Sequence, residues 1–375
     1  MAKRKLRVWQ RVLIIAGVIV FLFVAVVGGY VIYVFAQYYR IEDDLPLEIT
    51  DMTDKSVTGG TYSVLTFNIG FGAYDHDFDF FLDTGYDKDG NVICGTRAKA
   101  VSKENVLKNT NGAISVVKAA DPDFVFVQES DTDSDRSRHV DQRDMFAAAF
   151  ADYSYTFAVN YHSANILYPF GDPIGASNAG QLTLSKYDIA TAVRRSLPLS
   201  ESITDNMLDL DRCIAVNRLP VAGTDKELVL MNIHMSAYDE GGKIRALQTE
   251  FLGGILAEER EKGNYVIVGG DFNQIVAGDE KSFLKEGGER VPDWIATWAG
   301  EYDGYSLTAT LKSDGGDDIG TCRNNATPYD RKTVFTTVID GFIVSDNVKV
   351  EEIVNLTSHD FTYSDHNPVK LTFTI

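Results

Sequence analysis

Polar and acidic side chains follow apolar, strand-like runs at six separate places in the sequence. These places are Asn68 in TYSVLTFN, Glu129 after DFVFVQ, Asn232 and His234 in LVLMNIH, Asp271 and Asn273 in YVIVGGDFN, Asp340 in TVIDGF, and Asp365 and His366 in SDHNPV. Strand ends on one edge of a sheet converge, and open α/β folds place their ligand sites there. We therefore expect these side chains to meet in one site.

Four of these residues are carboxylates, which would repel one another in a poorly solvated cleft: Glu129, Asp271, Asp340 and Asp365. A hard cation removes that repulsion, and Mg²⁺ prefers oxygen ligands together with water and phosphate oxygens. The accompanying residues are Asn and His rather than Cys, which argues against a thiolate zinc site. A cation combined with amide and imidazolium donors stabilises the charge that develops during phosphoryl transfer. The pattern predicts phosphate-ester chemistry with Mg²⁺, and with Mn²⁺ as an alternative ion.

Some of these side chains also have structural interpretations. Asn68 could simply cap a turn. The segment DRSRH after Glu129 supplies Arg136, Arg138 and His139. They either grip a substrate headgroup or belong to a solvated loop, and Arg138 is our candidate for substrate binding.

In this order, the motifs N…QE…NxH…GDFN…D…SDH resemble the endonuclease/exonuclease/phosphatase superfamily. That superfamily includes DNase I-like nucleases, abasic-site endonucleases, neutral sphingomyelinases and inositol-polyphosphate 5-phosphatases. The resemblance covers about residues 60–375. It implies a four-layer α/β sandwich, in which two packed mixed sheets lie between helices.

The resemblance also implies a role for each site residue. Glu129, Asn68 and Asp365 would form the metal site. His234 would hydrogen-bond the scissile phosphate with support from Asn232, and Asn273 would bind a phosphate oxygen. Asp271 would orient or deprotonate the attacking water. His366 would face the phosphate, with Asp340 fixing its ring and raising its pKa.

Two departures from the family pattern weaken particular substrate assignments. Some nuclease relatives carry an acidic residue two places after the first Asn, where this chain has Gly70. The inositol-phosphatase hallmark Trp-Cys-Asp-Arg is replaced here by the segment Val338-Ile339-Asp340-Gly341. Both departures leave the expected hydrolytic residues in place.

Elements that could position these residues alternate along the chain. Strands are expected over 61–68, 123–128, 155–160, 180–185, 213–219, 227–234, 265–269, 333–344, 348–354 and 368–374. Helices are expected over 99–119, 141–151 and 242–262, and the last has apolar residues spaced for one buried face. The segments 71–95 and 278–298 look like insertions. This mixture predicts an α/β (α+β) layered sandwich.

The N-terminal segment predicts a membrane anchor. Residues 12–35 carry no charge, and about 20 apolar residues suffice to span a bilayer. A basic head, residues 1–11, should stay cytoplasmic, which sends a stalk (36–60) and a catalytic domain (61–375) to the other side. The alternative is a cleaved signal peptide, although its apolar core is usually shorter. Either way the domain is exported, and we expect a single-pass protein of the cell membrane.

The net charge limits the candidate binding partners, and the cysteine content limits the possible disulfides. The chain has a net charge of −19, which disfavours a general polyanion binder, so nucleic acid is the second candidate substrate. Cys94, Cys213 and Cys322 form no C-x-x-C, and either one disulfide with a free thiol or three buried thiols is compatible with them. No obligate protein partner is indicated.

Together these observations predict a metal-dependent phosphodiesterase outside the cytoplasm that hydrolyses a lipid headgroup, a nucleotide or a nucleic acid by in-line attack of water. Two alternatives stand beside it. One is an extracellular DNase-like nuclease, and the other is a non-catalytic, membrane-displayed binding module with the same fold.

Overall fold

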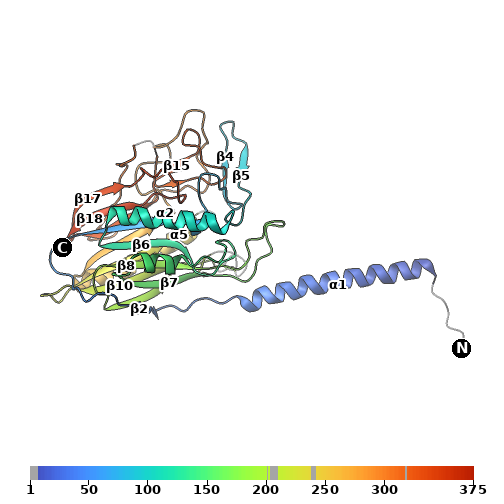
Figure 1. Ribbon diagram of the computed structural model, residues 1–375, viewed down its shortest axis with the longest axis horizontal. Coiled ribbons are helices and arrows are strands. Elements are labelled where there is room, and N and C mark those ends of the chain that lie inside the picture. The colour runs from blue at the N-terminus through green and yellow to red at the C-terminus, as the bar shows by residue number, and fades with distance from the viewer. Residues whose placement is uncertain (1–6, 201, 203–209, 238–241, 317–318) are drawn as a thin grey trace.

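Two seven-stranded sheets pack face to face in the computed structural model, which describes residues 7–200, 202, 210–237, 242–316 and 319–375 (Figure 1). The first sheet has the order β1 (Leu45–Pro46), β9 (Thr191–Ser196), β10 (Cys213–Pro220), β11 (Glu227–His234), β12 (Tyr265–Asp271), β16 (Asp340–Ser345) and β13 (Tyr305–Thr308). The second has the order β17 (Lys349–Asn355), β18 (Val369–Thr374), β3 (Thr61–Asn68), β6 (Phe124–Asp131), β8 (Asn178–Ser185), β7 (Ser154–His162) and β2 (Ile49–Thr50). Both sheets are mixed, because β3 pairs with β6 and β11 with β12 in parallel.

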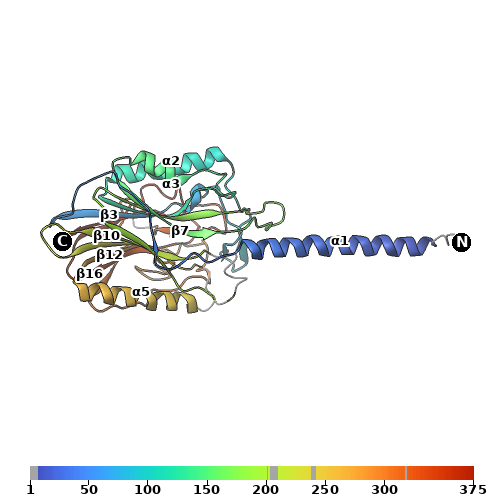
Figure 2. The ribbon, with the colours of Figure 1, turned by 90° about the horizontal axis from the view of Figure 1, so that it is seen from below.

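Helices cover the outer faces of the two sheets. Figure 2 shows α2 (Lys103–Ala120) and α3 (Gln142–Ala149) on one side of the sandwich and α5 (Lys243–Lys262) on the other. Ser102 begins α2 by accepting a hydrogen bond from Asn105 N at 3.2 Å, and Gly263, with φ of 69°, ends α5 in the left-handed region. The predicted four-layer α/β sandwich is confirmed.

The alternation of side chains along each strand builds three separate apolar layers. In β3, Val64 faces the other sheet and packs in the core between the sheets, whereas Leu65 and Phe67 face α2 and α3. In β11, Leu230 belongs to the core between the sheets, and Met231 packs toward α5. Strands with both faces buried read as continuous apolar runs, which is why their ends stand out in the sequence.

Two sequence expectations are corrected by the strand pairing. The segment 333–344 is not one strand but contains β15 (Thr336–Thr337), a break at Val338 and Ile339, and then β16. Residues 45–50 of the expected stalk form β1 and β2, which pair with β9 and β7 at the edges of the two sheets. The sandwich therefore begins before residue 61.

The two insertions lie against each other beside the sandwich. β4 (Thr84–Tyr86) and β5 (Val92–Cys94) form a hairpin within the first insertion, and Arg290 N of the second donates to Tyr86 O at 3.0 Å. β14 (Cys322–Arg323) pairs with β15 in the same region. All three cysteines are free thiols, with Cys94 exposed and the other two buried.

A long apolar helix, α1 (Val8–Gln37), projects from the domain (Figure 1). Its most apolar window has a mean hydropathy of 3.0, and none of that window is buried against the rest of the chain. By length and composition α1 could cross a membrane, and a signal sequence near an N-terminus has the same properties. Lys3, Arg4 and Lys5 of the expected basic head lie outside the described residues.

An ion pair between Glu259 of α5 and Arg218 of β10 gives the fold a testable pH dependence. Burial acts to raise the pKa of Glu259, but hydrogen bonds from Arg218, Lys262 and Asn264 outweigh it and lower that pKa from 4.5 to about 2. A lowered folded-state pKa stabilises the fold above the unfolded value, and this contribution is lost as pH falls toward 2.

We expect Glu259→Gln to lower the free energy of unfolding by roughly 3 kcal/mol at neutral pH, with a difference from wild type that shrinks as pH falls below 4.5. Urea unfolding between pH 7 and pH 3 measures it. The exposed neighbour Glu258, changed to Gln, serves as the control. A difference that is independent of pH would contradict the assignment.

Candidate active site

The strand ends that the sequence singles out meet at one edge of the sandwich. Because β11 and β12 are parallel, His234 and Asp271 end the two strands side by side in register. Asp340 opens β16 directly opposite Asp271. Asn68 ends β3 of the other sheet and reaches across to Asp271, so the site lies where the two sheets meet.

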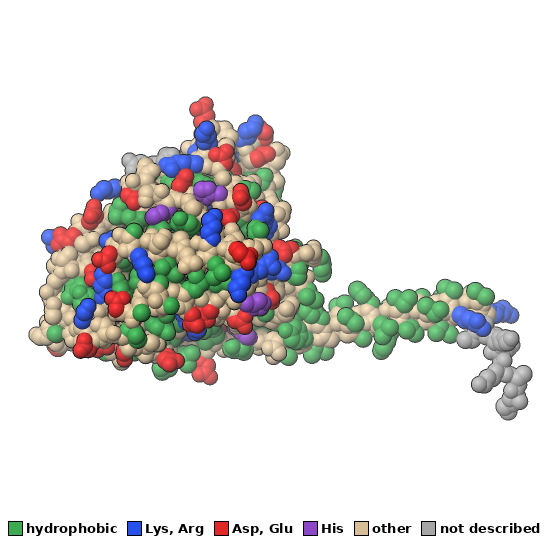
Figure 3. Space-filling view, viewed as in Figure 1, with side chains coloured by type: hydrophobic (Ala, Val, Ile, Leu, Met, Phe, Trp, Pro, Cys, Tyr) green, Lys and Arg blue, Asp and Glu red, His purple; other side chains and the backbone are tan. Residues whose placement is uncertain are grey.

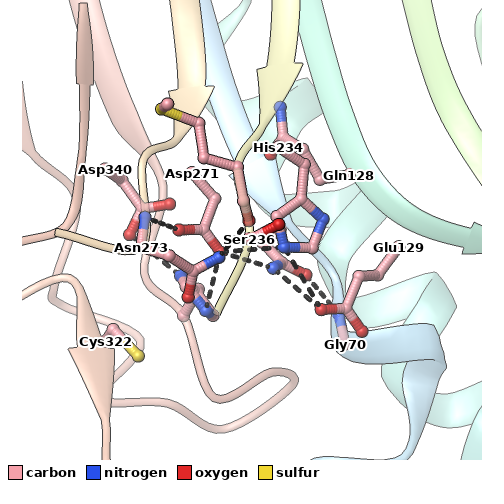
Figure 4. A network of polar contacts seen from close by, with 12 residues as sticks. Gly70, Gln128, Glu129, His234, Ser236, Asp271, Asn273, Cys322 and Asp340 are labelled. Atoms are coloured by element: carbon pink, nitrogen blue, oxygen red, sulfur yellow. Dashed lines mark hydrogen bonds and ion pairs between the residues drawn. The ribbon is translucent and has the colours of Figure 1, made fainter. Parts of the chain in front are cut away.

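Asp271 lies at the centre of a ring of polar contacts (Figure 4). Its Oδ2 accepts a hydrogen bond from Asn68 Nδ2 at 3.0 Å and lies 3.5 Å from His234 Nε2 and 3.6 Å from His366 Nε2. Its Oδ1 accepts from Asn273 N at 2.8 Å. Burial raises the pKa of Asp271 to about 7. A carboxylate with this pKa can take up and release a proton near neutral pH.

His366 and Asp340 form a buried pair behind Asp271. His366 Nδ1 lies 2.9 Å from Asp340 Oδ2. Burial acts to lower the pKa of His366, but Asp340 and Asp271 together hold that pKa well above its usual value. The ring is therefore an imidazolium, whose Nδ1–H donates to Asp340 and whose Nε2–H faces Asp271.

His234 carries the opposite protonation state. Burial and the nearby charge of Arg212 lower the pKa of His234 well below its usual value. The ring is neutral, and its Nδ1 is buried without a hydrogen-bond partner among the described residues. Two imidazoles with different charges flank one carboxylate, and such a divergence is typical of a site that separates proton transfer from charge stabilisation.

A bulge in β6 places Glu129 beside this ring. The pairing of β6 with β8 slips between Val127 and Ser130, and Glu129 has φ of 52°. Bulges often re-aim a side chain next to an active site, and a positive φ in a non-glycine residue costs conformational energy. Glu129 Oε1 accepts a hydrogen bond from Asn68 Nδ2 at 3.2 Å.

Glu129 and Asp365 are the described residues best suited to hold a divalent cation. Burial raises the pKa of Glu129, and the nearby carboxylate of Asp365 adds to that rise against the opposing charge of Arg136. Asp365 accepts a hydrogen bond from Asn325 Nδ2 at 2.8 Å, which orients it. A pair of neighbouring carboxylates matches the oxygen ligands of Mg²⁺ or Mn²⁺. Asn68, which donates to Glu129 and Asp271 and accepts from Gly70 N, holds these carboxylates in place in this structure.

Asp271, Asp340 and His366 form a second possible metal site, because one ligand atom from each lies within 4.8 Å of the others. It suits a metal less well than Glu129 and Asp365. His366 Nδ1 is already bonded to Asp340, and a protonated imidazole has no lone pair to offer a metal. This group is better suited to proton transfer and to charge stabilisation than to metal binding.

A cavity of about 680 Å³ opens over these residues. Its walls combine buried cationic side chains with an apolar side made of Phe71, Tyr74, Phe80, Leu82, Tyr161 and Ile174. Arg136 is 5% exposed, is held by Asp131 through bonds of 3.1 and 2.8 Å, and lies 4.2 Å from the ring centre of Phe71. The ion pair with Asp131 fixes the Arg136 guanidinium at the cavity wall.

Arg323 is a cavity residue that sequence reasoning missed. It is 1% exposed, and its guanidinium donates to backbone oxygens such as Asp75 O at 3.0 Å. No carboxylate among the described residues lies within ion-pair distance of it, and burial lowers its pKa. A buried cation with no acidic partner is costly, so an anionic ligand would relieve that cost. The run of polar residues Arg323-Asn324-Asn325 is the feature of the sequence that could have indicated a site residue here.

Two candidate substrate-binding residues lie away from the cavity. Asn232 is fully buried between the sheets, where it accepts from Gln128 Nε2 at 2.7 Å and donates to Leu182 O at 3.1 Å. Arg138 donates to Ala100 O at 2.8 Å and does not line the cavity. Both expectations are corrected, because the loop turns Arg136 rather than Arg138 inward and the pleat of β11 turns Asn232 into the core.

Six of the other expected site residues lie at the cavity. His234, Asp271, Asn273, Asp365, His366 and Glu129 all line the cavity. Asn273 Nδ2 donates to Met235 O at 2.8 Å, which fixes its amide at the cavity wall. Gly70 explains one departure from the family pattern. A Cβ there would lie 2.7 Å from Asp365 Oδ1 and 2.6 Å from the Tyr74 ring, at φ of 50°.

This chain resembles known proteins in sequence pattern and in fold. A family model described as Endonuclease/Exonuclease/phosphatase family matches residues 65–366. A search among curated proteins found no match. A solved endonuclease/exonuclease/phosphatase from Beutenbergia cavernae DSM 12333 has 16% sequence identity and a TM-score of 0.51, over 84% of this chain and 72% of that one. This likeness shows the shared fold.

Two further solved structures were also compared. Truncated TDP2 of Caenorhabditis elegans has 16% identity and a TM-score of 0.48, over 85% of this chain and 100% of that one. An endonuclease/exonuclease/phosphatase from Bacteroides vulgatus has 15% identity and a TM-score of 0.49, over 84% of this chain and 99% of that one.

Proposed function

Because this chain belongs to the endonuclease/exonuclease/phosphatase family, whose members are generally metal-dependent phosphoester hydrolases, we propose that it is a phosphodiesterase that uses Mg²⁺ or Mn²⁺. One observation carries the proposal. Asp271, a buried carboxylate with a pKa of about 7, lies between a neutral and a charged imidazole at a cavity whose walls carry buried arginines.

The residues of the chain divide the chemistry of hydrolysis among them. Asp271 holds the attacking water and takes up its proton as the water oxygen bonds to phosphorus. The N–H groups of His234 and His366 and the amide of Asn273 stabilise charge on the phosphate oxygens. One P–O bond breaks, the leaving oxygen receives a proton, and the products are an alcohol and a phosphomonoester. A cation held by Glu129 and Asp365 would supply further charge stabilisation.

The two kinds of cavity wall favour a diester over inorganic phosphate or a small monoester. A diester carries an organic group on each side of phosphorus. The cavity volume of about 680 Å³ exceeds what one phosphate needs, and its apolar side offers Phe71, Phe80 and Leu82 to an organic substituent.

Hydrolysis of bis(p-nitrophenyl) phosphate by the detergent-purified full chain tests the proposal. We expect turnover with Mg²⁺ or Mn²⁺ and none with EDTA. Turnover that is insensitive to chelation would contradict the metal assignment. Binding of a diester with no turnover under any divalent cation would instead support the non-catalytic binding module, and preferential cleavage of DNA would support the nuclease alternative.

We further propose that α1 anchors the protein with the domain outside the cytoplasm. Arg7 precedes α1 and Arg11 lies near its N-terminal end, and basic residues remain on the cytoplasmic side. Cys94 is exposed and free, whereas Cys213 and Cys322 are buried. When intact cells are treated with a membrane-impermeant maleimide, the wild-type protein should therefore be labelled and the Cys94→Ser variant should not. Labelling of the wild type only after lysis would place the domain inside.

A further inference from the structure

The loop between β7 and β8 presents an apolar tip on the side of the domain from which α1 projects (Figures 1 and 2). Leu167 is 50% exposed, Tyr168 56% and Phe170 91%. Figure 3 shows hydrophobic side chains where the domain meets α1. Large exposed apolar residues that gather on one loop indicate an interaction surface.

Backbone pairing holds this tip in a defined position. Ile166 and Gly175 exchange two hydrogen bonds of 3.1 Å, and Ile174 N donates to Tyr168 O at 3.0 Å. Ala176 N donates to Asp135 Oδ2 at 2.7 Å at the base of the loop. The apolar tip is therefore the end of a braced hairpin.

The tip also lies at the rim of the catalytic cavity. β7 runs parallel to β6, since both pair antiparallel with β8, so its loop leaves the sandwich at the edge where Glu129 lies. Tyr168 packs against Phe81 with ring centres 5.8 Å apart. The neighbours of Phe81 on both sides, Phe80 and Leu82, line the cavity, and Leu82 is 42% exposed.

Contacts with α1 give the depth of this rim relative to a membrane. Tyr30 of α1 donates to Asn165 O at 3.2 Å and accepts from Leu167 N at 3.0 Å. About 20 helical residues cross the hydrocarbon core, so a span that starts after Arg11 ends close to Tyr30. Tyrosine is enriched at the membrane–water interface. Contact with Tyr30 puts the loop at the level of the interface.

We propose that Leu167, Tyr168 and Phe170 insert into the interface of the same bilayer that α1 spans, which turns the cavity toward lipid headgroups and makes the phosphodiester of a bilayer lipid the substrate. This inference rests on the proposed phosphodiesterase function and on the anchor. Hydrolysis consumes one water, breaks one P–O bond of the lipid, and yields an alcohol and a phosphomonoester. With a net charge of −19, the protein gains no attraction from anionic lipids, so insertion depends on apolar contact.

Depth-dependent quenching tests the insertion without using activity. The full chain with Phe170→Trp is placed in nanodiscs of phosphatidylcholine with bromines on the acyl chains, and its emission is compared with that of the wild type. We expect the added fluorescence to be quenched. Val350→Trp is the control, because Val350 is an exposed apolar residue of β17, far from α1 (Figure 1). An unquenched Phe170→Trp would overturn the insertion.

A comparison of two substrates tests the choice of lipid. The wild type and the double variant Leu167→Ser with Phe170→Ser are assayed in nanodiscs of phosphatidylcholine, phosphatidylethanolamine and sphingomyelin, and separately on bis(p-nitrophenyl) phosphate. We expect the double variant to lose about tenfold in lipid turnover and to keep its turnover of the soluble diester. Val350→Ser should change neither.

The outcomes separate this inference from the proposed function. Wild-type turnover of the soluble diester without turnover of any of the three lipids would overturn the lipid assignment and leave the phosphodiesterase standing. Equal loss of both activities in the double variant would also overturn it. Failure of the wild type on both substrates would reject the phosphodiesterase itself, and quenching would still decide the insertion.

Discussion

Substitution of Asp271 by Asn is expected to lower kcat for a phosphodiester by about a thousandfold, with little change in the folding of the protein. The amide cannot take up a proton from water. It also places either an NH₂ group or a weaker acceptor where Oδ2 now faces Asn68, His234 and His366. The site would therefore lose both the base and the centre of its hydrogen-bond ring.

The pH dependence of the wild type should report the same residue. Burial raises the pKa of Asp271 to about 7, so the base form predominates above that pH and is lost below it. We expect kcat to fall as pH decreases through about 7. Steady-state kinetics between pH 5 and pH 9 measure this acidic limb.

Asp225→Asn is the matched control for this substitution. Asp225 is exposed in the turn between β10 and β11, at the opposite end of β11 from His234, so the same change of side chain should leave kcat unaltered. Circular dichroism and thermal unfolding check that both variants fold. Near-wild-type activity of Asp271→Asn would reject its role as the base.

Replacement of Glu129 by Gln should weaken Mg²⁺ binding by about a hundredfold and reduce activity in parallel at limiting metal. The change removes a negative charge while keeping the shape of the side chain. Calorimetric titration of Mg²⁺ into the purified protein measures the affinity directly. Activity regained at high Mg²⁺ would show that the loss comes from binding.

The stability of the Glu129 variant provides a second, independent readout. Burial and the carboxylate of Asp365 raise the pKa of Glu129, so the negative charge costs folding energy when no cation is present. The metal-free Glu129→Gln variant should therefore unfold at a temperature no lower than that of the wild type. Glu280→Gln, at an exposed turn, should change neither affinity nor stability. Unchanged Mg²⁺ binding in Glu129→Gln would place the metal elsewhere.

The pKa values of the two histidines shift in opposite directions because the charged groups around the two rings differ. His366 has two carboxylates facing it, Asp340 at 2.9 Å and Asp271 at 3.6 Å, and it keeps its proton despite burial. His234 is equally buried, but Arg212 lies near it and its Nδ1 has no acidic partner among the described residues. The site thus places a histidine with a raised pKa and a histidine with a lowered pKa beside the titratable carboxylate of Asp271.

The sequence by itself determined the layers and most of the site. Strands such as β3 and β11 have both faces buried, so their apolar runs end abruptly at Asn68 and at His234. This pattern depends only on the local alternation of side chains and on which faces exclude water. The motif GDFN identified Asp271 and Asn273 as site residues in the same way, since β12 ends at Asp271 within this motif.

Only the tertiary structure decided which loop residues enter the cavity and where the domain begins. Arg136 and Arg138 are two residues apart. Arg136 packs on the distant ring of Phe71 and lines the cavity, whereas Arg138 donates to Ala100 O and does not. Arg323 belongs to a two-residue strand, and β1 and β2 owe their form to pairing with β9 and β7. Segments this short carry too little local preference to specify their conformation, so partners far away in the sequence decide it.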